Sequence, residues 1–201
     1  MHPNFTIISG GQTGPDIAAL KVAVSHRIPY TGFVPRGFIN ERGRIPEEFI
    51  SSAYGSLRET QSAASAERTK LNTEEADGVL TLSFCKEEDM PTVSAGTEIG
   101  VVVGKVEKKD IHFANLRKYR EEGGEGEVDA VIRWLDETNV ERCAIGGPRE
   151  SEEPGLEKES EEFLNRVLEK VKSRGWRSIR FGEGRPREKI EPFLKDNRWT
   201  S

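Results

Sequence analysis

The stretch Phe5-Thr-Ile-Ile-Ser-Gly-Gly-Gln-Thr-Gly-Pro-Asp16 decides the fold. Its apolar, β-prone start meets a glycine-rich turn, and Pro15 then stands where a helix can begin, because proline suits the first helical turn. A strand, a glycine turn and a helix in this order present backbone N–H groups to an anion. We therefore predict a site here for a phosphate-bearing or otherwise anionic ligand. The alternative is a tight turn that binds nothing.

The turn matches neither of the common nucleotide-binding motifs. Its glycines at positions 10, 11 and 14 lack the spacing of the dinucleotide fingerprint, and no Gly-Lys-Ser/Thr follows them as in a Walker loop. The motif by itself therefore names no ligand.

The composition of the 201 residues limits the class of protein. The net charge of −5 argues against nucleic acid as the main partner, and the apolar residues, 34 % of the chain, gather in runs that can form a core. No stretch approaches the length of a membrane span and no signal peptide precedes Phe5, so we expect a cytoplasmic protein with no membrane partner. Cys85 and Cys143 are predicted to be free thiols, and neither they nor the three histidines have the spacing of a metal site.

Predicted strands and helices alternate over most of the chain. The strands are expected at 5–9, 28–34, 77–83, 111–115 and 142–147, and the helices at 15–26, 63–75, 98–108, 128–138 and 154–174. This alternation predicts an α/β fold with a mostly parallel sheet, strand 5–9 at its centre, and helices on both faces. Loops are expected at 35–46, 54–60, 84–93 and 116–127. Residues 1–174 are predicted to form a single ligand-binding domain, and 175–201 a C-terminal extension.

Candidate binding residues follow the carboxyl ends of these strands, where open parallel sheets bind their ligands. Ser94 and Thr97 open a helix, although capping that helix is their alternative role. Arg149 could pair bidentately with a phosphate or carboxylate, or form a surface salt bridge instead. The candidates of this kind are Gly10, Gly11, Gln12, Thr13, Gly14, Asp16, Arg36, Gly37, Ser94, Gly96, Thr97, Gly146, Gly147, Arg149 and Ser151.

Seven short motifs occur in an order that resembles a known family. They are Gly10-Gly-Gln-Thr-Gly-Pro-Asp16, Pro35-Arg-Gly37, Leu57-Arg-Glu-Thr60, Arg68-Thr-Lys-Leu-Asn72, Asp77-Gly-Val-Leu80, Gly96-Thr97, and Gly147-Pro-Arg-Glu-Ser151 with Pro154-Gly155. Together they resemble the putative molybdenum carrier family of circularly permuted YpsA-like proteins. That family belongs to a Rossmann-like superfamily with the Lonely Guy phosphoribohydrolases and the lysine-decarboxylase-like proteins.

The resemblance carries expectations about fold, ligand and assembly. It implies a Rossmann-like three-layer sandwich, a nucleotide-like or phosphorylated ligand, and a homodimer or homotetramer. Some family members carry the molybdenum cofactor, which makes this phosphorylated pterin (molybdopterin) a possible cargo. The shared motifs also add Arg58, Arg68 and Asn72 to the candidate binding residues.

The chain departs from the phosphoribohydrolase pattern at the residues that would cleave a nucleotide. That pattern is a glycine pair, any residue, Gly-Thr, and a glutamate three positions after the threonine. Here Ser94 and Ala95 replace the glycine pair, and the third position after Thr97 is Gly100. Asp16, Glu59 and Glu98 remain as candidate catalytic acids.

Three functions therefore stay open from the sequence. The first is a carrier or sensor that binds a phosphorylated heterocycle, the second a hydrolase of nucleotide-like glycosides, and the third a protein-interaction module. Many hydrogen-bond donors and no evident acid–base pair favour binding over catalysis.

Overall fold

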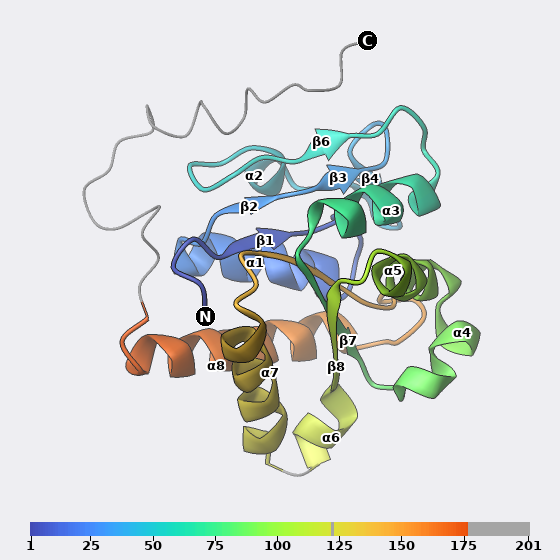
Figure 1. The fold of residues 1–201 in the computed structure, drawn as a ribbon. Helices are drawn as coiled ribbons and strands as arrows, with labels where there is room; N and C mark the ends of the chain where they lie inside the picture. The colour runs from blue at the N-terminus through green and yellow to red at the C-terminus, as the bar shows by residue number, and fades with distance from the viewer. Residues whose placement is uncertain (122, 177–201) are drawn as a thin grey trace.

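A five-stranded parallel sheet forms the centre of the structure, a computed structural model that describes residues 1–121 and 123–176, without the side chain of Ser65. The strands lie in the order β2–β1–β9–β7–β8, and every neighbouring pair is parallel (Figure 1). Their bounds are β1 (Thr6–Ile8), β2 (Tyr30–Thr31), β7 (Gly78–Ser83), β8 (Asp110–Asn115) and β9 (Arg142–Gly146). The predicted parallel sheet is confirmed. Its middle strand is β9, and not β1 as predicted, because β9 inserts between β1 and β7.

Helices cover both faces of the sheet, as predicted for a Rossmann-like α/β sandwich. On one face α1 and α7 both contact α8, whereas on the other α3 contacts α5 (Figure 1). These five helices correspond to the predicted ones, and their bounds are α1 (Pro15–His26), α3 (Ser65–Glu75), α5 (Ala95–Val106), α7 (Glu125–Thr138) and α8 (Leu156–Ser173). No helix among the described residues is both long and apolar enough to cross a membrane.

The two faces of the sheet have cores of different size. Successive residues of a strand point to opposite faces, so Ile7 and Leu80 belong to the large core under α1, α7 and α8. Their neighbours Ile8 and Val79 belong instead to a small cluster with Ala144. Fewer and smaller apolar side chains fill this second face, which leaves space between the sheet and the helices α3 and α5.

The predicted strand 28–34 is divided in two. Gly32 lies so close to β1 that a Cβ atom on it would be 1.9 Å from the Ser9 carbonyl oxygen, and the chain bends there. The strand after the bend, β3 (Phe33–Val34), leaves the main sheet and pairs in parallel with β6 (Arg58–Glu59). The predicted loop 54–60 therefore contains a short strand.

Three other predicted loops also contain regular structure. Residues 35–46 include an antiparallel hairpin, β4 (Ile39–Asn40) with β5 (Gly43–Arg44), which leads into α2 (Glu47–Ile50). Residues 84–93 form a 3-10 turn, η1 (Glu87–Asp89), and a short helix, α4 (Met90–Val93), whose Met90 is fully buried.

The predicted loop 116–127 holds α6 (Leu116–Glu121) and the first turn of α7. Leu116 is fully buried and Tyr119 meets the ring of Phe163 edge-on at 5.0 Å, so two apolar contacts stabilise a segment that is otherwise charged. Gly123 and Gly124 have positive φ angles and separate the two helices.

Trp134 and Trp176 both contact other parts of the same chain. Trp134 lies in the protein's own core, where it stacks on His112 with ring centroids 5.5 Å apart. Trp176 donates a hydrogen bond to the His2 carbonyl oxygen at 3.1 Å. From residue 177 onward the predicted extension 175–201, with Trp199, lies outside the described residues, and the division into a domain and an extension stays a prediction.

Replacing Gly147 by alanine is expected to lower the free energy of unfolding by about 1–3 kcal/mol. The added methyl group would lie 2.1 Å from the Leu82 carbonyl oxygen and 2.8 Å from Cγ of Pro15. Gly126→Ala in α7 is the matched control, because nothing lies within 4 Å of the added atom and alanine favours a helix by about 0.5–1 kcal/mol. In urea denaturation, the free energy of unfolding should fall below the wild-type value for Gly147→Ala and rise above it for Gly126→Ala. Equal values for the two variants would contradict the close approach at Gly147.

Candidate functional site

A cavity of about 70 Å³ lies at the carboxyl ends of β1, β7 and β9, between the sheet and the helices α3 and α5. Its floor is apolar and includes Ile8, Val79 and Ala144, whereas its walls carry hydroxyls, glycines and two arginines. It brings together eleven of the predicted binding residues, namely Gly10, Gln12, Asp16, Arg68, Asn72, Ser94, Gly96, Thr97, Gly146, Gly147 and Arg149.

The N–H groups of the glycine turn are already used within the protein. Gly10 donates to Oδ1 of Asp16 at 3.1 Å, and Gly11 donates to Oγ of Ser9 at 3.2 Å. Thr13 donates to Oε1 of the neighbouring Gln12 at 3.0 Å. The expectation that this turn offers free donors to a ligand is therefore wrong for these three groups, because side chains of the turn and of α1 accept their hydrogen bonds.

The Asp16 carboxylate lies at the glycine turn, where the sequence predicts an anionic ligand. Asp16 is 2 % exposed, and its Oδ1 lies 2.9 Å from Nη1 of Arg68 on α3. Burial raises the pKa of Asp16 above its ordinary value, and the charge of Arg68 together with main-chain hydrogen bonds from Gln12 and Gly10 offsets only part of this effect.

Arg68 retains binding capacity beyond this ion pair. Its Nε is buried and has no hydrogen-bond partner among the described residues. A Cβ atom on Gly10 would lie 1.7 Å from Nη1 of Arg68, so only glycine at position 10 lets the guanidinium lie against the turn. An unpartnered buried donor costs free energy, which an acceptor in the cavity would recover.

The amino-terminal end of α5 forms another wall of the cavity, beside the one formed by α3. Ser94 is the N-cap residue, and its Oγ accepts hydrogen bonds from the Thr97 N–H at 3.3 Å and from the Thr97 hydroxyl at 3.0 Å. The alternative role predicted for Ser94, capping this helix, is confirmed. A Cβ atom on Gly96 would meet nothing within 4 Å, so the first turn of the helix is open toward the cavity.

Arg149 completes the cationic wall of the cavity. It follows β9 and lines the cavity. Within the described residues only its main chain is hydrogen-bonded: its N–H donates to Oε2 of Glu152 at 2.8 Å, and its carbonyl oxygen accepts from the N–H groups of Glu152 and Glu153. The predicted alternative, a salt bridge from its guanidinium to a nearby glutamate, does not form there. Two guanidiniums and the positive end of a helix therefore face one small space, an arrangement suited to an oxyanion.

Several predicted residues support the cavity without lining it. Thr13 and Ser151 both donate hydroxyl hydrogen bonds to the Glu41 carboxylate. Gly14 packs against the Pro148 carbonyl, and Gly11 packs against Ile45.

Asn72 lines the cavity, but its side-chain amide is committed elsewhere. It accepts from the Phe33 N–H at 2.6 Å and donates to the Phe33 carbonyl oxygen at 2.9 Å. Its role is therefore to join α3 to β3.

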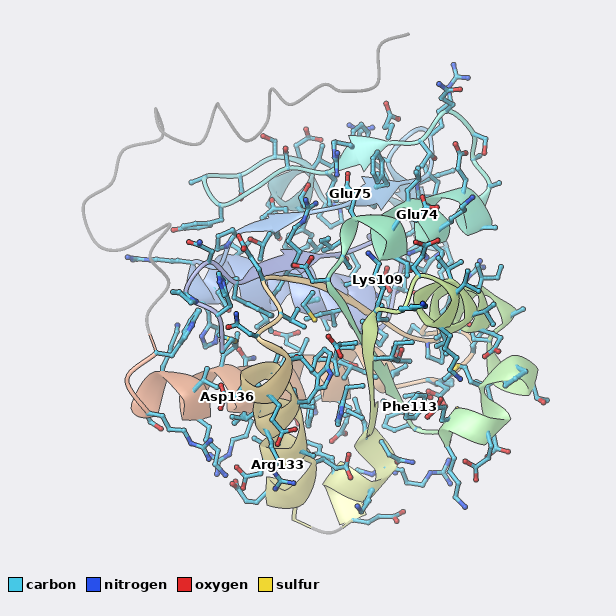
Figure 2. All side chains as sticks on the ribbon, viewed as in Figure 1. Glu74, Glu75, Lys109, Phe113, Arg133 and Asp136 are labelled. Atoms are coloured by element: carbon cyan, nitrogen blue, oxygen red, sulfur yellow. The ribbon has the colours of Figure 1, made fainter. Side chains whose placement is uncertain are left out.

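Three other predicted binding residues, Arg36, Gly37 and Arg58, lie away from the cavity. Arg36 is exposed, and the Gly37 N–H donates to the Glu59 carboxylate. Arg58 stacks on the Phe33 ring at 4.0 Å and pairs with Glu75, which Figure 2 shows at the end of α3. These contacts hold the β3–β6 pair to α3.

Three threonines and one glycine of the cavity wall are not among the predicted binding residues: Thr69, Thr73, Thr81 and Gly100. Thr69 and Thr73 share the helix face of Arg68 and Asn72, so helical periodicity could have identified them. Gly100 occupies the position at which the phosphoribohydrolase pattern has its glutamate. Of the three candidate catalytic acids, Asp16 alone lines the cavity in the described part of the chain, and Glu59 and Glu98 do not.

Glu41 joins the β4–β5 hairpin to this edge of the sheet. Its carboxylate accepts hydrogen bonds from Thr13 and Ser151, and its N–H donates to Oε1 of Gln12 at 3.0 Å. Burial raises the pKa of Glu41, but the hydrogen bonds from Ser151 and Thr13, with the charge of Arg149, outweigh burial and hold the pKa below its ordinary value. Glu41 is thus a carboxylate acceptor close to the cationic wall.

The parallel sheet with helices on both faces is a Rossmann-like α/β fold. The chain belongs to the circularly permutated YpsA SLOG family, whose model matches residues 7–168. Among solved structures, it is similar to a putative molybdenum carrier protein from Syntrophus aciditrophicus SB, with 29 % identity and a TM-score of 0.71. That similarity covers 84 % of this chain and 98 % of the other. No curated protein matches the chain.

Arg68→Ala is expected to lower the free energy of unfolding by about 3–5 kcal/mol at neutral pH, because it leaves a buried carboxylate unpaired. The loss should shrink in acid. Since the pKa of folded Asp16 lies above 3.8, the stability tied to its protonated form is complete below pH 3.8 and disappears as the pH rises through the folded pKa. Removing Arg68 raises that pKa further.

Urea denaturation at about pH 5 and about pH 7 measures this difference. The control is Arg44→Ala, because Arg44 is 61 % exposed and its pair with Glu47 should contribute no more than about 1 kcal/mol at either pH. An Arg68→Ala variant with the same loss at both pH values would show that Asp16 does not titrate in this range.

Proposed function

We propose that the protein is a carrier or sensor that binds a phosphorylated heterocycle, such as the molybdenum cofactor or a nucleotide-like molecule. One observation carries the proposal. The guanidiniums of Arg68 and Arg149 and the open first turn of α5 face a single small cavity, and each has donors without a partner among the described residues. Guanidinium groups and helix amino-termini are the usual protein groups that bind phosphate.

The cavity is large enough for only one part of such a ligand. A volume of about 70 Å³ holds a few water molecules, so it admits a phosphate group but not a pterin or purine ring. The phosphate would lie between the arginines, and the heterocycle would extend past the cavity mouth. No cysteine lines the cavity in the described residues, so recognition of the molybdenum cofactor would rest on its phosphate and not on a protein sulfur ligand to molybdenum.

The chemistry of the cavity favours binding over glycoside hydrolysis. Hydrolysis of a glycosidic bond ordinarily uses two carboxyl groups, one as an acid and one as a base or nucleophile. Among the described residues Asp16 is the single carboxylate in the lining, and it is paired with Arg68. The hydrolase alternative would therefore need a further acid from elsewhere.

Native mass spectrometry with the molybdenum cofactor, adenosine 5′-monophosphate and inorganic phosphate tests the proposal. We expect a 1:1 ligand-to-subunit complex with a phosphorylated heterocycle, and the same spectra would report whether the protein is the homodimer or homotetramer that we also propose. Release of adenine from the monophosphate would favour the hydrolase instead. Protein that retains none of the three compounds would contradict the proposed function.

Titrations with adenosine 5′-monophosphate should distinguish the individual contacts. Arg149→Ala is expected to weaken binding about tenfold or more, because a hydrogen bond to a charged group contributes about 1.5–3 kcal/mol. Thr97→Ala should do the same, because the Thr97 hydroxyl would exchange its hydrogen bond to Ser94 Oγ for one to the charged ligand. Arg149→Lys should recover only part of the loss, since lysine lacks the planar fork. Melting temperatures should change little, because a helix-cap contact is worth about 1 kcal/mol. Unchanged affinity in Arg149→Ala would remove this arginine from the site.

A further inference from the structure

The position of Asp16 raises a question that the proposed function leaves open. Its carboxylate already uses the donors that an incoming oxyanion needs, the Gly10 N–H at 3.1 Å and Nη1 of Arg68 at 2.9 Å. Its second oxygen faces Gly146, where a Cβ atom would lie 3.2 Å from Oδ2. The carboxylate is therefore held between the turn after β1 and the end of β9, inside the space that a phosphate would occupy.

The charged residues of the described cavity lining are two arginines and one aspartate, and their positive charge does not balance both Asp16 and a doubly charged ligand. From α3 Asp16 faces Arg68, and from its own turn it faces main-chain N–H groups. The end of β9 presents Gly146, and α5 presents Ser94 and Thr97, none of which is charged. Arg149, from the loop after β9, is the other charged residue of the described lining.

A phosphate or sulfate dianion added to this set would leave a buried negative charge without a partner. Two arginines balance the dianion alone, but they do not also balance the Asp16 carboxylate. Uncompensated buried charge is strongly unfavourable, and a buried carboxyl group ordinarily escapes it by taking up a proton.

We propose that Asp16 is a specificity-determining residue that competes with the ligand for Arg68, and that the site takes up one proton when a doubly charged oxyanion binds. The inference rests on the proposed function and adds a rule for it: the protonated Asp16 carboxyl group releases Arg68 to the ligand. Burial, which already raises the pKa of Asp16 in the free protein, acts in the same direction. Binding should then be tighter in mild acid and weaker in mild base.

The Asp16→Asn variant imitates the protonated state permanently. An asparagine oxygen can still accept the Gly10 N–H, but it carries no charge to hold Arg68. We expect this variant to bind a dianion about tenfold or more tightly than the wild type at about pH 8, and the difference to shrink as the pH falls and Asp16 of the wild type takes up its proton. The control is Asp110→Asn, which makes the same change of net charge at an exposed position on β8 outside the cavity lining.

Calorimetric titration with inorganic sulfate provides the test, because sulfate keeps its charge over this range whereas phosphate itself titrates. Wild-type affinity should fall by up to about tenfold per pH unit where one proton is taken up, and titrations in two buffers with different ionisation enthalpies should count that proton directly. Asp16→Asn should bind with no proton uptake, and Asp110→Asn should behave as the wild type does.

The possible outcomes separate this inference from the proposed function. Wild-type binding of sulfate that is independent of pH and equally strong in Asp16→Asn would overturn the role of Asp16 and leave the proposed oxyanion site intact. A loss of binding in Asp16→Asn, with an unchanged melting temperature, would show that the carboxylate assists the ligand and would equally overturn the inference. Absence of sulfate binding by the wild type and by the Asp16→Asn variant would overturn this inference, whereas the proposed function is overturned only if the native mass spectra show none of its three compounds bound.

Discussion

The buried ion pair between Asp16 and Arg68 is the contact on which the arrangement of the cavity depends. It joins the first turn of α1 to α3 across 52 residues of sequence, and it is possible only because glycine at position 10 leaves room for the guanidinium. A buried pair of this kind is costly to desolvate, so it is a weak source of net stability. Its effect is to fix geometry, because neither partner can move without leaving the other unpaired. The same constraint keeps an arginine pointed into the space under α3 and α5.

The sequence predicted those parts of the molecule that local residues determine. The helix 15–26 follows from Pro15 and a periodic apolar face, and the parallel sheet follows from apolar runs that alternate with helices. The helix α6 was missed because its stability comes mainly from the buried Leu116 and the contact of Tyr119 with Phe163, which lies far along the chain. The two-residue strand β3 was not separated from β2 because it exists only by pairing with β6.

The candidate site shows the same division between local and distant causes. Glycines, hydroxyls and arginines that follow strand ends could be assigned to one edge of the sheet once a parallel sheet was expected. The sequence could not predict that the protein itself accepts the hydrogen bonds of the Gly10 and Gly11 N–H groups, since this depends on where the side chains of Asp16 and Ser9 point. A second example is Glu153, whose buried carboxylate accepts from the Ser83 hydroxyl and from the N–H groups of Phe84 and Cys85 at the end of β7. At the ends of both β1 and β7, carboxylates of the protein thus accept the hydrogen bonds of main-chain N–H groups.

The hairpin of β4 and β5 has a consequence for the dynamics of this edge. Three adjacent residues bind it to three different segments: Asn40 to the Gly11 carbonyl oxygen, Glu41 to the loop after β9, and Arg42 to Glu157 on α8. Surface hairpins of this length usually open independently of the sheet and exchange their amide hydrogens quickly. Here, opening of the hairpin would break its contacts with the turn after β1 and with the loop after β9 at once. The hairpin, this turn and this loop therefore form one cooperative unit. Their amides would then exchange together, at a rate set by the free energy of breaking all of these attachments in one opening.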